Sequence, residues 1–414
     1  MNARYGAVML GLLLCGLAGS AGAQKGPGTG PWDVKALRKT PAHQVAETTA
    51  VKEGDRSVTL TSLYYEGEPW KGNPTRVFAY YARPTELPEK KLPAMVLVHG
   101  GGGTAFPQWA RLWAARGYAA LAMDLSGSGP DGKRLPDGGP GQDDDAKFRR
   151  LKEGVKNAWS YHAVAAVIRA VSLLRAMPEV DRNRVGITGI SWGGYLTSIV
   201  MSLDDRLKAA VPVYGCGFLH ENSVWVPILA QLPEDERRTW IENFEPSRYL
   251  PRCKIPVLWV NGTNDFAYPL DSYQKSYRAM PGPRTLCVTV NMPHGHEAGW
   301  ARPEIHLFTD SLFRQKELAR GLAAVGLPQV DGETVRAAYD SPTAMRAAEL
   351  HWTTDLDKPW AQREWRTAKG RVPSLDLVEA TLPPERPLVF FLTLTDGRGA
   401  VTSTEHVELR PSSR

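Results

Sequence analysis

The spacing of hydrophobic residues changes along the chain, and each spacing predicts its own kind of secondary structure. Early in the chain, three segments alternate polar and apolar residues or carry β-branched and aromatic side chains, at 45–52, 57–65 and 75–82. Gly-Asp and Gly-Asn pairs separate these segments, and such pairs are typical of tight turns. We therefore expect an antiparallel start to a sheet.

The middle of the chain alternates short apolar runs with helical stretches. The runs lie at 94–98, 118–123, 184–188, 208–214, 256–260 and 285–290. Continuous apolar runs of this length are typical of buried parallel strands. The clearest helix spans 155–176, with apolar residues on one face and Pro178 beyond its end. This alternation predicts an α/β fold with right-handed βαβ units in a doubly wound, mostly parallel sheet.

An insertion at 216–250 interrupts this alternation between two predicted strands. It contains three Pro and two Trp, and its pattern predicts a helix over 233–244 with the proline in the first turn. We expect the insertion to lie above the sheet as a partial lid.

The pattern changes again beyond about residue 327. Short strand-like segments follow one another with turn signals between them, at 334–339, 347–353, 364–367, 375–381, 388–395 and 401–409. They predict a small antiparallel β-sandwich of the immunoglobulin or fibronectin III type. With 414 residues the chain exceeds one ordinary domain, so we expect an α/β domain over 24–328 and the sandwich over 329–414.

The first 23 residues have the pattern of a secretory signal peptide. Arg4 supplies the positive charge, 7–17 the apolar core, and Ala-Gly-Ala at 21–23 a cleavage site near Ala23. A membrane span, for which the apolar stretch is too short, and a lipoprotein anchor on Cys15 are the alternatives. The mature chain is expected outside the cytoplasm, periplasmic or extracellular, with no membrane span.

Composition and charge narrow the range of partners. Apolar residues make up 43% and charged residues 23% of the chain, and the net charge of +6 is dispersed. These values exclude a disordered chain and argue against a nucleic-acid partner. Cys216, Cys253 and Cys287 lack metal-type spacing and form at most one disulfide. We expect no metal and no cofactor, and the oligomeric state stays open.

A Gly-x-Ser-x-Gly motif stands directly between a predicted strand and a predicted helix. It reads Gly-Ile-Ser-Trp-Gly at 189–193, and a nucleophile on such a sharp turn needs neighbours without Cβ atoms. Ser191 is therefore the predicted nucleophile, a tight structural junction being the alternative. A glycine run at 100–103 ends an earlier strand and predicts an oxyanion hole, an ordinary glycine turn being the alternative. The expected donors are the amides of Gly101, Gly102 and Trp192.

A serine nucleophile needs a histidine base and a carboxylate that orients this histidine. The acid should follow the next-to-last strand, where Asp265 lies in a loop. Glu245 is the alternative acid. Asp265 could instead cap the helix that follows it. The base should follow the last strand, where the chain offers His294 and His296. We favour His296 because Gly295 allows its loop to approach the serine, and we expect His294 to border the site.

Four tryptophans are expected near the carboxyl ends of the strands, where ligands bind in open α/β sheets. Trp109, Trp192, Trp225 and Trp300 fall in predicted loops or insertions, so they are candidates for a surface that stacks sugar or aryl groups. Core packing is the alternative, and it accounts for most tryptophans in folded proteins.

These motifs together resemble the α/β-hydrolase superfamily over about residues 94–312. Within it, the segment 189–195 is similar both to acetylxylan esterase and dienelactone hydrolase-like esterases and to prolyl oligopeptidase-type peptidases. Those peptidases usually carry a large β-propeller first, whereas only 24–93 precedes the sheet here. The stretch 293–300 is similar to exported acetylxylan esterase-like enzymes. The resemblance implies that Ser191, Asp265 and His296 are nucleophile, acid and base.

The sequence thus predicts an exported serine hydrolase that cleaves small-molecule or carbohydrate esters through an acyl-enzyme. Acetylated carbohydrates are the substrates that the resemblance suggests. Two alternatives remain: an aminopeptidase or acylpeptidase of the prolyl oligopeptidase type with the same three residues, and a non-catalytic protein whose sandwich binds glycans. The ratio of amide to ester turnover distinguishes the first alternative, and absence of a reactive serine would indicate the second.

Overall fold

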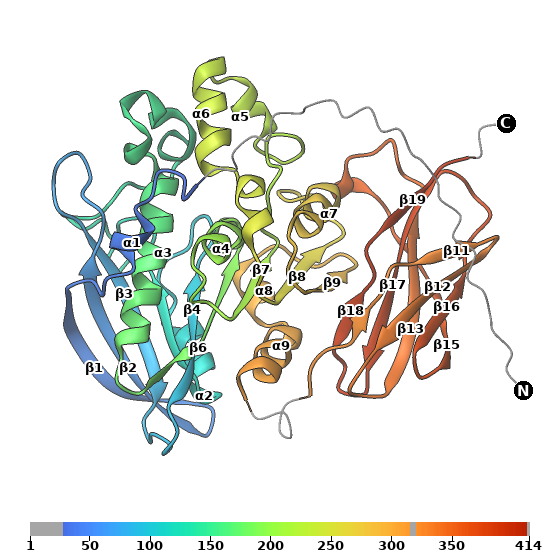
Figure 1. The fold of residues 1–414 in the computed structure, drawn as a ribbon, viewed down its shortest axis with the longest axis horizontal. Coiled ribbons are helices and arrows are strands. Elements are labelled where there is room, and N and C mark those ends of the chain that lie inside the picture. Colours follow the sequence, from blue (N-terminus) through green and yellow to red (C-terminus); the bar gives the residue numbers. More distant parts are fainter. Residues whose placement is uncertain (1–27, 315–319, 412–414) are drawn as a thin grey trace, which may run out of the picture.

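The computed structural model describes residues 28–314 and 320–411. An α/β layer occupies most of the molecule, and an all-β unit lies at one end of it (Figure 1). The predicted signal peptide at 1–23, with Cys15, lies outside the described residues. Within the described residues, no helix is long and apolar enough to cross a membrane.

The central sheet has nine strands in the order β1-β2-β3-β5-β4-β6-β7-β8-β9. The first three strands pair antiparallel, β3 pairs antiparallel with β5, and all later pairs are parallel. The predicted antiparallel start and mostly parallel continuation are confirmed. The strands are β1 (His43–Glu53), β2 (Arg56–Glu66), β3 (Arg76–Pro84), β4 (Leu92–Val98), β5 (Ala119–Met123), β6 (Val180–Ile190), β7 (Ala209–Val213), β8 (Val257–Gly262) and β9 (Arg284–Thr289).

Helices cover both faces of this sheet, and each face has its own hydrophobic core. One core contains the buried faces of α1 (Val34–Leu37), α3 (Trp159–Ala176), α4 (Trp192–Leu203) and α7 (Leu270–Ala279). The other contains α2 (Pro107–Ala115) and α9 (Pro303–Phe313). Because apolar side chains leave water on both faces, β4, β5, β7 and β8 are buried throughout and need no polar alternation.

The helix predicted over 155–176 begins later than its pattern suggests. A 3₁₀ turn, η3 (Val155–Asn157), comes first, and Ala158 is extended with φ −72° and ψ 143° before α3 starts at Trp159. Met177, just before Pro178, is extended as well, as expected for a residue that precedes proline.

The insertion at 216–250 forms a helical excursion at the upper edge of the view in Figure 1. It contains α5 (Val226–Ala230) and α6 (Glu234–Phe244), followed by two 3₁₀ turns, η4 (Pro246–Arg248) and η5 (Leu250–Arg252). The predicted helix is confirmed, with Pro233 immediately before it. The buried indole of Trp240 donates a hydrogen bond to Lys147 O (3.0 Å), and so ties α6 to the π-helical turn η1 (Asp145–Arg149).

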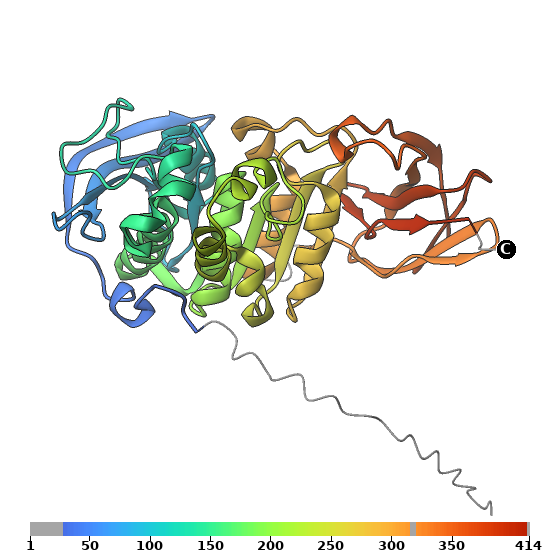
Figure 2. The ribbon, with the colours of Figure 1, turned by 90° about the horizontal axis from the view of Figure 1, so that it is seen from above.

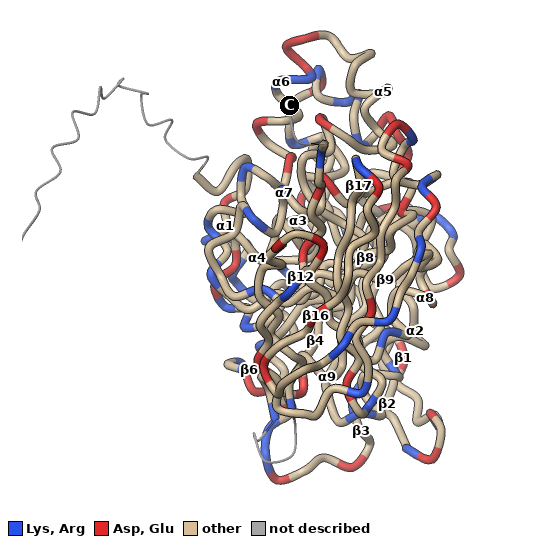
Figure 3. The backbone as a smooth tube through the Cα atoms, turned by 90° about the vertical axis from the view of Figure 1, so that its right-hand side faces the viewer, with Lys and Arg blue, Asp and Glu red and all other residues tan. Residues whose placement is uncertain are grey.

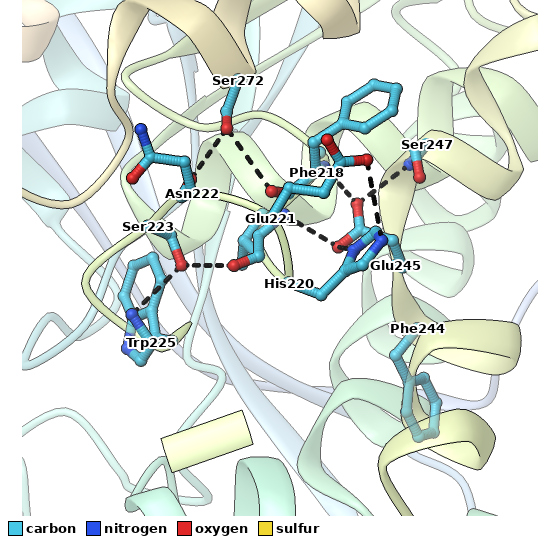
Figure 4. A network of polar contacts seen from close by, with 12 residues as sticks. Phe218, His220, Glu221, Asn222, Ser223, Trp225, Phe244, Glu245, Ser247 and Ser272 are labelled. Carbon is cyan, nitrogen blue, oxygen red and sulfur yellow. Dashed lines mark hydrogen bonds and ion pairs between the residues drawn. The ribbon is translucent and has the colours of Figure 1, made fainter. Parts of the chain in front are cut away.

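A fully buried carboxylate holds the base of this insertion. Glu245 accepts hydrogen bonds from the amides of Phe218 (2.6 Å), Leu219 (3.0 Å) and Ser247 (3.2 Å). His220 Nδ1 lies 3.4 Å from the same carboxylate. Figure 4 shows Glu245 facing His220 and the start of the insertion. Because these donors satisfy the hydrogen-bonding capacity of the buried carboxylate, Glu245 holds the two ends of the insertion together.

The contact between His220 and Glu245 predicts a pH-dependent stability. The hydrogen bond to Glu245 raises the pKa of His220 above its ordinary value of 6.5, although burial opposes this. A raised folded-state pKa means that the stabilisation is complete below about pH 6.5 and is lost as the pH rises through the folded-state pKa. We expect His220→Gln to lower Tm by about 1–3 °C at about pH 5.5 and to leave it unchanged at about pH 9.

Scanning calorimetry at the two pH values measures this difference. His43→Gln, a change at an exposed position of β1, is the matched control and should shift Tm equally at both. An effect of His220→Gln that is the same at both pH values would contradict a charged contact.

The C-terminal unit is a sandwich of two antiparallel five-stranded sheets. Alternate buried residues of both sheets form its core, which includes Val335, Leu350, Val378 and Leu392. The strands are β10 (Ala324–Val325), β11 (Gln329–Asp331), β12 (Thr334–Asp340), β13 (Met345–Thr353), β14 (Arg366–Lys369), β15 (Arg371–Ser374), β16 (Leu377–Thr381), β17 (Leu388–Asp396), β18 (Val401–Ser403) and β19 (Val407–Leu409). Since β10 already pairs with β12, the sandwich starts a few residues before the expected boundary at 328.

The sandwich packs against β9, the edge strand of the central sheet (Figure 2). Val288 N donates to Ser403 Oγ (3.1 Å), and Arg278 makes a two-pronged ion pair with Glu405 at 2.8 and 2.7 Å. Apolar side chains from both units, with Trp360 among them, form one cluster beneath these bonds. An open strand edge invites pairing with other chains, and the sandwich covers this one.

The charged side chains are dispersed over the chain, as expected, and the three described cysteines are not paired. Figure 3 shows Lys and Arg interspersed with Asp and Glu along the tube. Cys216, Cys253 and Cys287 are buried free thiols, so no disulfide links them. Within the described ranges, no group of three or more His, Cys, Asp and Glu side chains is arranged to hold a metal ion.

Candidate active site

Ser191 stands on a strained turn between β6 and α4. Its φ of 59° and ψ of −118° cost about 1–3 kcal/mol for a residue with a side chain. A Cβ at Gly189 would lie 2.1 Å from Gly193 O, and one at Gly193 would lie 1.9 Å from Val98 O. Both motif glycines are therefore required by close backbone approach, and the turn presents Ser191 above the carboxyl ends of the strands.

His294, in the loop after β9, links Ser191 to Asp265. Its Nε2 lies 3.0 Å from Ser191 Oγ, and its Nδ1 lies 2.7 Å from Asp265 Oδ2. Asp265 is buried in the loop after β8. A carboxylate only accepts, so Nδ1–H donates to Asp265 and Nε2 is free to accept the hydroxyl hydrogen of Ser191.

The surroundings hold both partners in place. Asp265 Oδ1 accepts hydrogen bonds from the amides of Ala267 (2.9 Å) and Tyr268 (2.7 Å). The imidazole of His294 stacks on Tyr214, with ring centroids 4.4 Å apart. The Phe266 ring, 58% exposed, packs on it at 4.9 Å. The carboxylate and the imidazole are therefore oriented before any substrate binds.

The expectation that His296 is the residue next to the serine is wrong. His296 begins α8 (His296–Trp300), and its Nε2 accepts a hydrogen bond from Gly100 N (3.0 Å). The argument from Gly295 fails because a Cβ there would meet nothing within 4 Å, so this glycine permits no special approach. Burial lowers the pKa of His296 to about 4. His294, the less favoured of the two candidates for the base, makes the contact with Ser191 instead.

Asp265 stands where the expected acid was placed, and Glu245 does not reach His294. The Glu245 carboxylate is occupied by the insertion, as described above. The alternative role of Asp265 as a helix cap is not realised, because α7 follows Pro269 without a side-chain cap, and Oδ1 instead accepts from two amides of the loop before it. The two carboxylate oxygens thus serve two different purposes.

The glycine run forms a turn against Ser191. Gly103 N donates to Gly100 O (3.2 Å), and Gly102 has φ +68°, which is the signature of a type II turn. A Cβ at Gly100 would lie 2.9 Å from Ser191 Cβ, and one at Gly101 would lie 3.1 Å from Trp192 Cδ1. Trp192 is the first residue of α4, where a helix leaves amide hydrogens without intrahelical partners.

The expected tryptophan surface is mostly core. Trp109 and Trp300 are 2% and 7% exposed and stack on each other with centroids 5.3 Å apart. They belong to the core beneath α2 and α9, so their role as a stacking surface is not supported. Trp225, from the insertion, is partly buried and packs on Trp192 at 4.5 Å. The insertion thus brings Trp225 beside the Gly-x-Ser-x-Gly motif.

The comparisons with known families match most of the α/β layer. A family model described as acetyl xylan esterase (AXE1) matches residues 32–249, more than half of the chain. A second model, PhoPQ-activated pathogenicity-related protein, matches residues 228–331. The first match includes Ser191 and the glycine turn.

Curated relatives are both esterases and peptidases. Acetyl esterase Axe7A of Xylanibacter ruminicola is 21% identical over 58% of this chain and 56% of its own length. A putative carboxymethylenebutenolidase of Salmonella typhimurium is 26% identical over 61% of this chain and 83% of its own length. Dipeptidyl aminopeptidase BIII of Pseudoxanthomonas mexicana is 26% identical over 51% of this chain. The chain spans only 31% of that peptidase's length, and 31% and 25% of the lengths of two other curated peptidases.

Two solved acetyl xylan esterases share the fold. The enzyme from Paenibacillus sp. R4 has a TM-score of 0.54 at 24% identity, and the one from Thermoanaerobacterium sp. JW/SL YS485 has a TM-score of 0.55 at 22% identity. Each match covers 67% of this chain and 92% of the other. The family match over more than half of the sequence, together with this shared α/β-hydrolase fold, establishes that the chain belongs to the acetyl xylan esterase (AXE1) family.

Proposed function

We propose that this chain is a serine esterase that works through an acyl-enzyme. The observation that carries the proposal is the hydrogen-bonded series from Ser191 through His294 to Asp265, with distances of 3.0 and 2.7 Å. A serine hydroxyl is a weak nucleophile near neutral pH unless a base removes its proton as it attacks. His294 has the position and the tautomer for this task, so it takes the role that the family resemblance had suggested for His296.

In the proposed reaction, Ser191 Oγ attacks the ester carbonyl while its proton passes to His294 Nε2. The carbonyl oxygen becomes an oxyanion, and we propose that the amides of Gly101, Gly102 and Trp192 stabilise it. His294 then gives its proton to the departing alkoxide, and the acyl group stays on Ser191. Water, activated by the same histidine, releases the acid and restores the serine.

For the substrate, we propose acetyl esters, acetylated carbohydrates among them. The AXE1 family match and the similarity to an acetyl esterase support this choice. We also propose that the chain is exported after cleavage near Ala23, on the pattern of residues 1–23. We further propose that the chain from 24 up to β10 is the catalytic domain and that the sandwich is a small immunoglobulin- or fibronectin III-like domain, supported by its two antiparallel sheets.

A peptidase acting on aminoacyl or acylpeptide substrates is the second candidate. It is favoured by the similarity to dipeptidyl aminopeptidase BIII, and the same three side chains serve amide hydrolysis.

The third candidate is a glycan-binding protein without catalytic activity, in which the sandwich would bind the glycan. Trp360 is not available as an exposed surface for stacking sugars, because it packs in the apolar cluster between the two units.

Labelling with a fluorophosphonate tests the proposal directly. We expect the wild-type protein to be labelled and Ser191→Ala to remain unlabelled with an unchanged Tm, since a small change at a surface turn costs about 0.5 kcal/mol or less. Turnover of a nitrophenyl acetate and of aminoacyl anilides, measured side by side, then separates esterase from peptidase. Faster anilide turnover would reverse the order of the first two candidates, and an unlabelled wild type would support the glycan-binding protein.

A further inference from the structure

Two histidines outside the proposed catalytic series hold both backbone groups of Gly100. His296 Nε2 accepts a hydrogen bond from Gly100 N at 3.0 Å. His99 Nδ1 lies 2.8 Å from Gly100 O. Gly100 opens the turn that lies against Ser191 and Trp192, so the two imidazoles fix the start of this turn from opposite sides.

The hydrogen bonds also fix which nitrogen of each ring carries its proton. His99 Nε2 accepts from Leu125 N (2.9 Å), so its proton is on Nδ1 and is donated to Gly100 O. His296 Nε2 accepts from Gly100 N, so its proton is on Nδ1 as well. Burial lowers the pKa of both histidines, and the neutral rings keep the acceptor nitrogens that these contacts need.

The two imidazole rings pack closely against the glycine turn. A Cβ at Gly103 would lie 2.7 Å from His296 Nε2 and 2.8 Å from His99 Nδ1. Phe106 supports the other side of the His296 ring, with centroids 4.7 Å apart. The ring is therefore held between Phe106 and the turn and has little freedom to leave the Gly100 amide.

The tips of the turn have no such support. Gly101 and Gly102 are exposed, and glycine loses more conformational freedom on folding than any other residue. Donors stabilise an oxyanion only when their position is fixed before the charge develops. A run of glycines therefore needs contacts from other parts of the chain to fix its position. Gly100 has such contacts, from His99 and His296.

We propose that His296 is a positioning residue, which fixes the oxyanion-binding turn by accepting the Gly100 amide hydrogen. This inference rests on the proposed esterase function. His296 follows His294 by two residues, so one short segment carries the base to Ser191 and also sets the glycine turn relative to it. The Gly100 amide, which His296 occupies, is not available as an oxyanion donor.

The test compares two substitutions of His296. His296→Gln offers an amide oxygen that reaches the position of Nε2, whereas His296→Phe fills the space without an acceptor. His306→Phe is the matched control, because His306 in α9 is a partly buried histidine whose pKa burial lowers to about 3, but it packs on Trp113 of α2. For each variant, kcat and KM for an acetyl ester, Tm, and inhibition by a trifluoromethyl ketone are measured.

We expect His296→Phe to lower kcat about 10- to 100-fold with KM changed less than about threefold, because displaced oxyanion donors cost less than a deleted one. Inhibition by the trifluoromethyl ketone, which needs the same donors, should weaken in parallel. His296→Gln should recover most of both, and His306→Phe should keep the wild-type kcat.

Three results would overturn the inference. One is a wild-type kcat in His296→Phe, and another is a loss in His296→Gln as large as in His296→Phe, since both exclude a role for the acceptor. The third is complete inactivity of both variants, which would make His296 the base. Inactivity and lack of labelling in the wild type would instead contradict the proposed function, so the two failures are distinguishable.

Discussion

Replacing His294 with alanine should lower kcat by about 10⁴- to 10⁶-fold, as much as replacing Ser191. The two side chains act as one unit, because Ser191 Oγ attacks only as its proton moves to His294 Nε2, 3.0 Å away. The double variant should therefore be no slower than either single variant. The activity that remains should come from the oxyanion donors and substrate binding alone.

The measurement is kcat for an acetyl ester, with Tm to confirm that each variant is folded. His296→Gln serves as the comparison, because it changes the neighbouring histidine and keeps a hydrogen-bond acceptor. A His294→Ala enzyme with more than about a hundredth of the wild-type kcat would exclude His294 as the general base, since a positioned base alone contributes at least that factor.

The second large effect is expected for Asp265→Asn, at about 10⁴-fold in kcat. The side-chain oxygen of asparagine should take the place of Oδ1, because the amides of Ala267 and Tyr268 point at it. The NH₂ group then faces His294 Nδ1, which must accept. The imidazole proton moves to Nε2, and this nitrogen no longer accepts the proton of Ser191.

Steady-state kinetics across pH measures this loss, and the matched control is Asp396→Asn in the sandwich. Asp396 is also buried and accepts hydrogen bonds from two amides, those of Arg398 (2.8 Å) and Ala400 (3.1 Å), but lies in a different sheet from the site. Its substitution should affect Tm and leave kcat unchanged. A kcat for Asp265→Asn within tenfold of the wild type would show that the tautomer of His294 does not depend on this carboxylate.

Most of the strands are predictable from the sequence, because an apolar run of β-sheet length must be buried wherever it occurs. The pattern misses three short strands, β10, β11 and β15, and β15 shows the limit of this rule. All of its residues, Arg371–Ser374, are exposed, so no hydrophobic periodicity marks it. Its pairing with β16 depends on backbone hydrogen bonds, to which the side chains give no clue.

The tryptophans show a second limit. The sequence places Trp109 and Trp300 near the ends of strands, but burial depends on what packs over them. Their stacked pair lies in the core beneath α2 and α9. The same residue type on a loop serves as core or as a binding surface according to neighbours that are distant in sequence.

The sequence alone is enough to locate the turn that carries Ser191 and the loop that carries Asp265. Gly189, Ser191 and Gly193 interact through contacts that the neighbouring strand and helix impose, and such short-range requirements appear directly in the residue types. The choice between His294 and His296 is not of this kind. It depends on Tyr214 stacking under one ring and on the amide of Gly100, 196 residues away, meeting the other. Only the folded chain brings these groups together, because the path of a loop is set by the packing of the elements on either side of it.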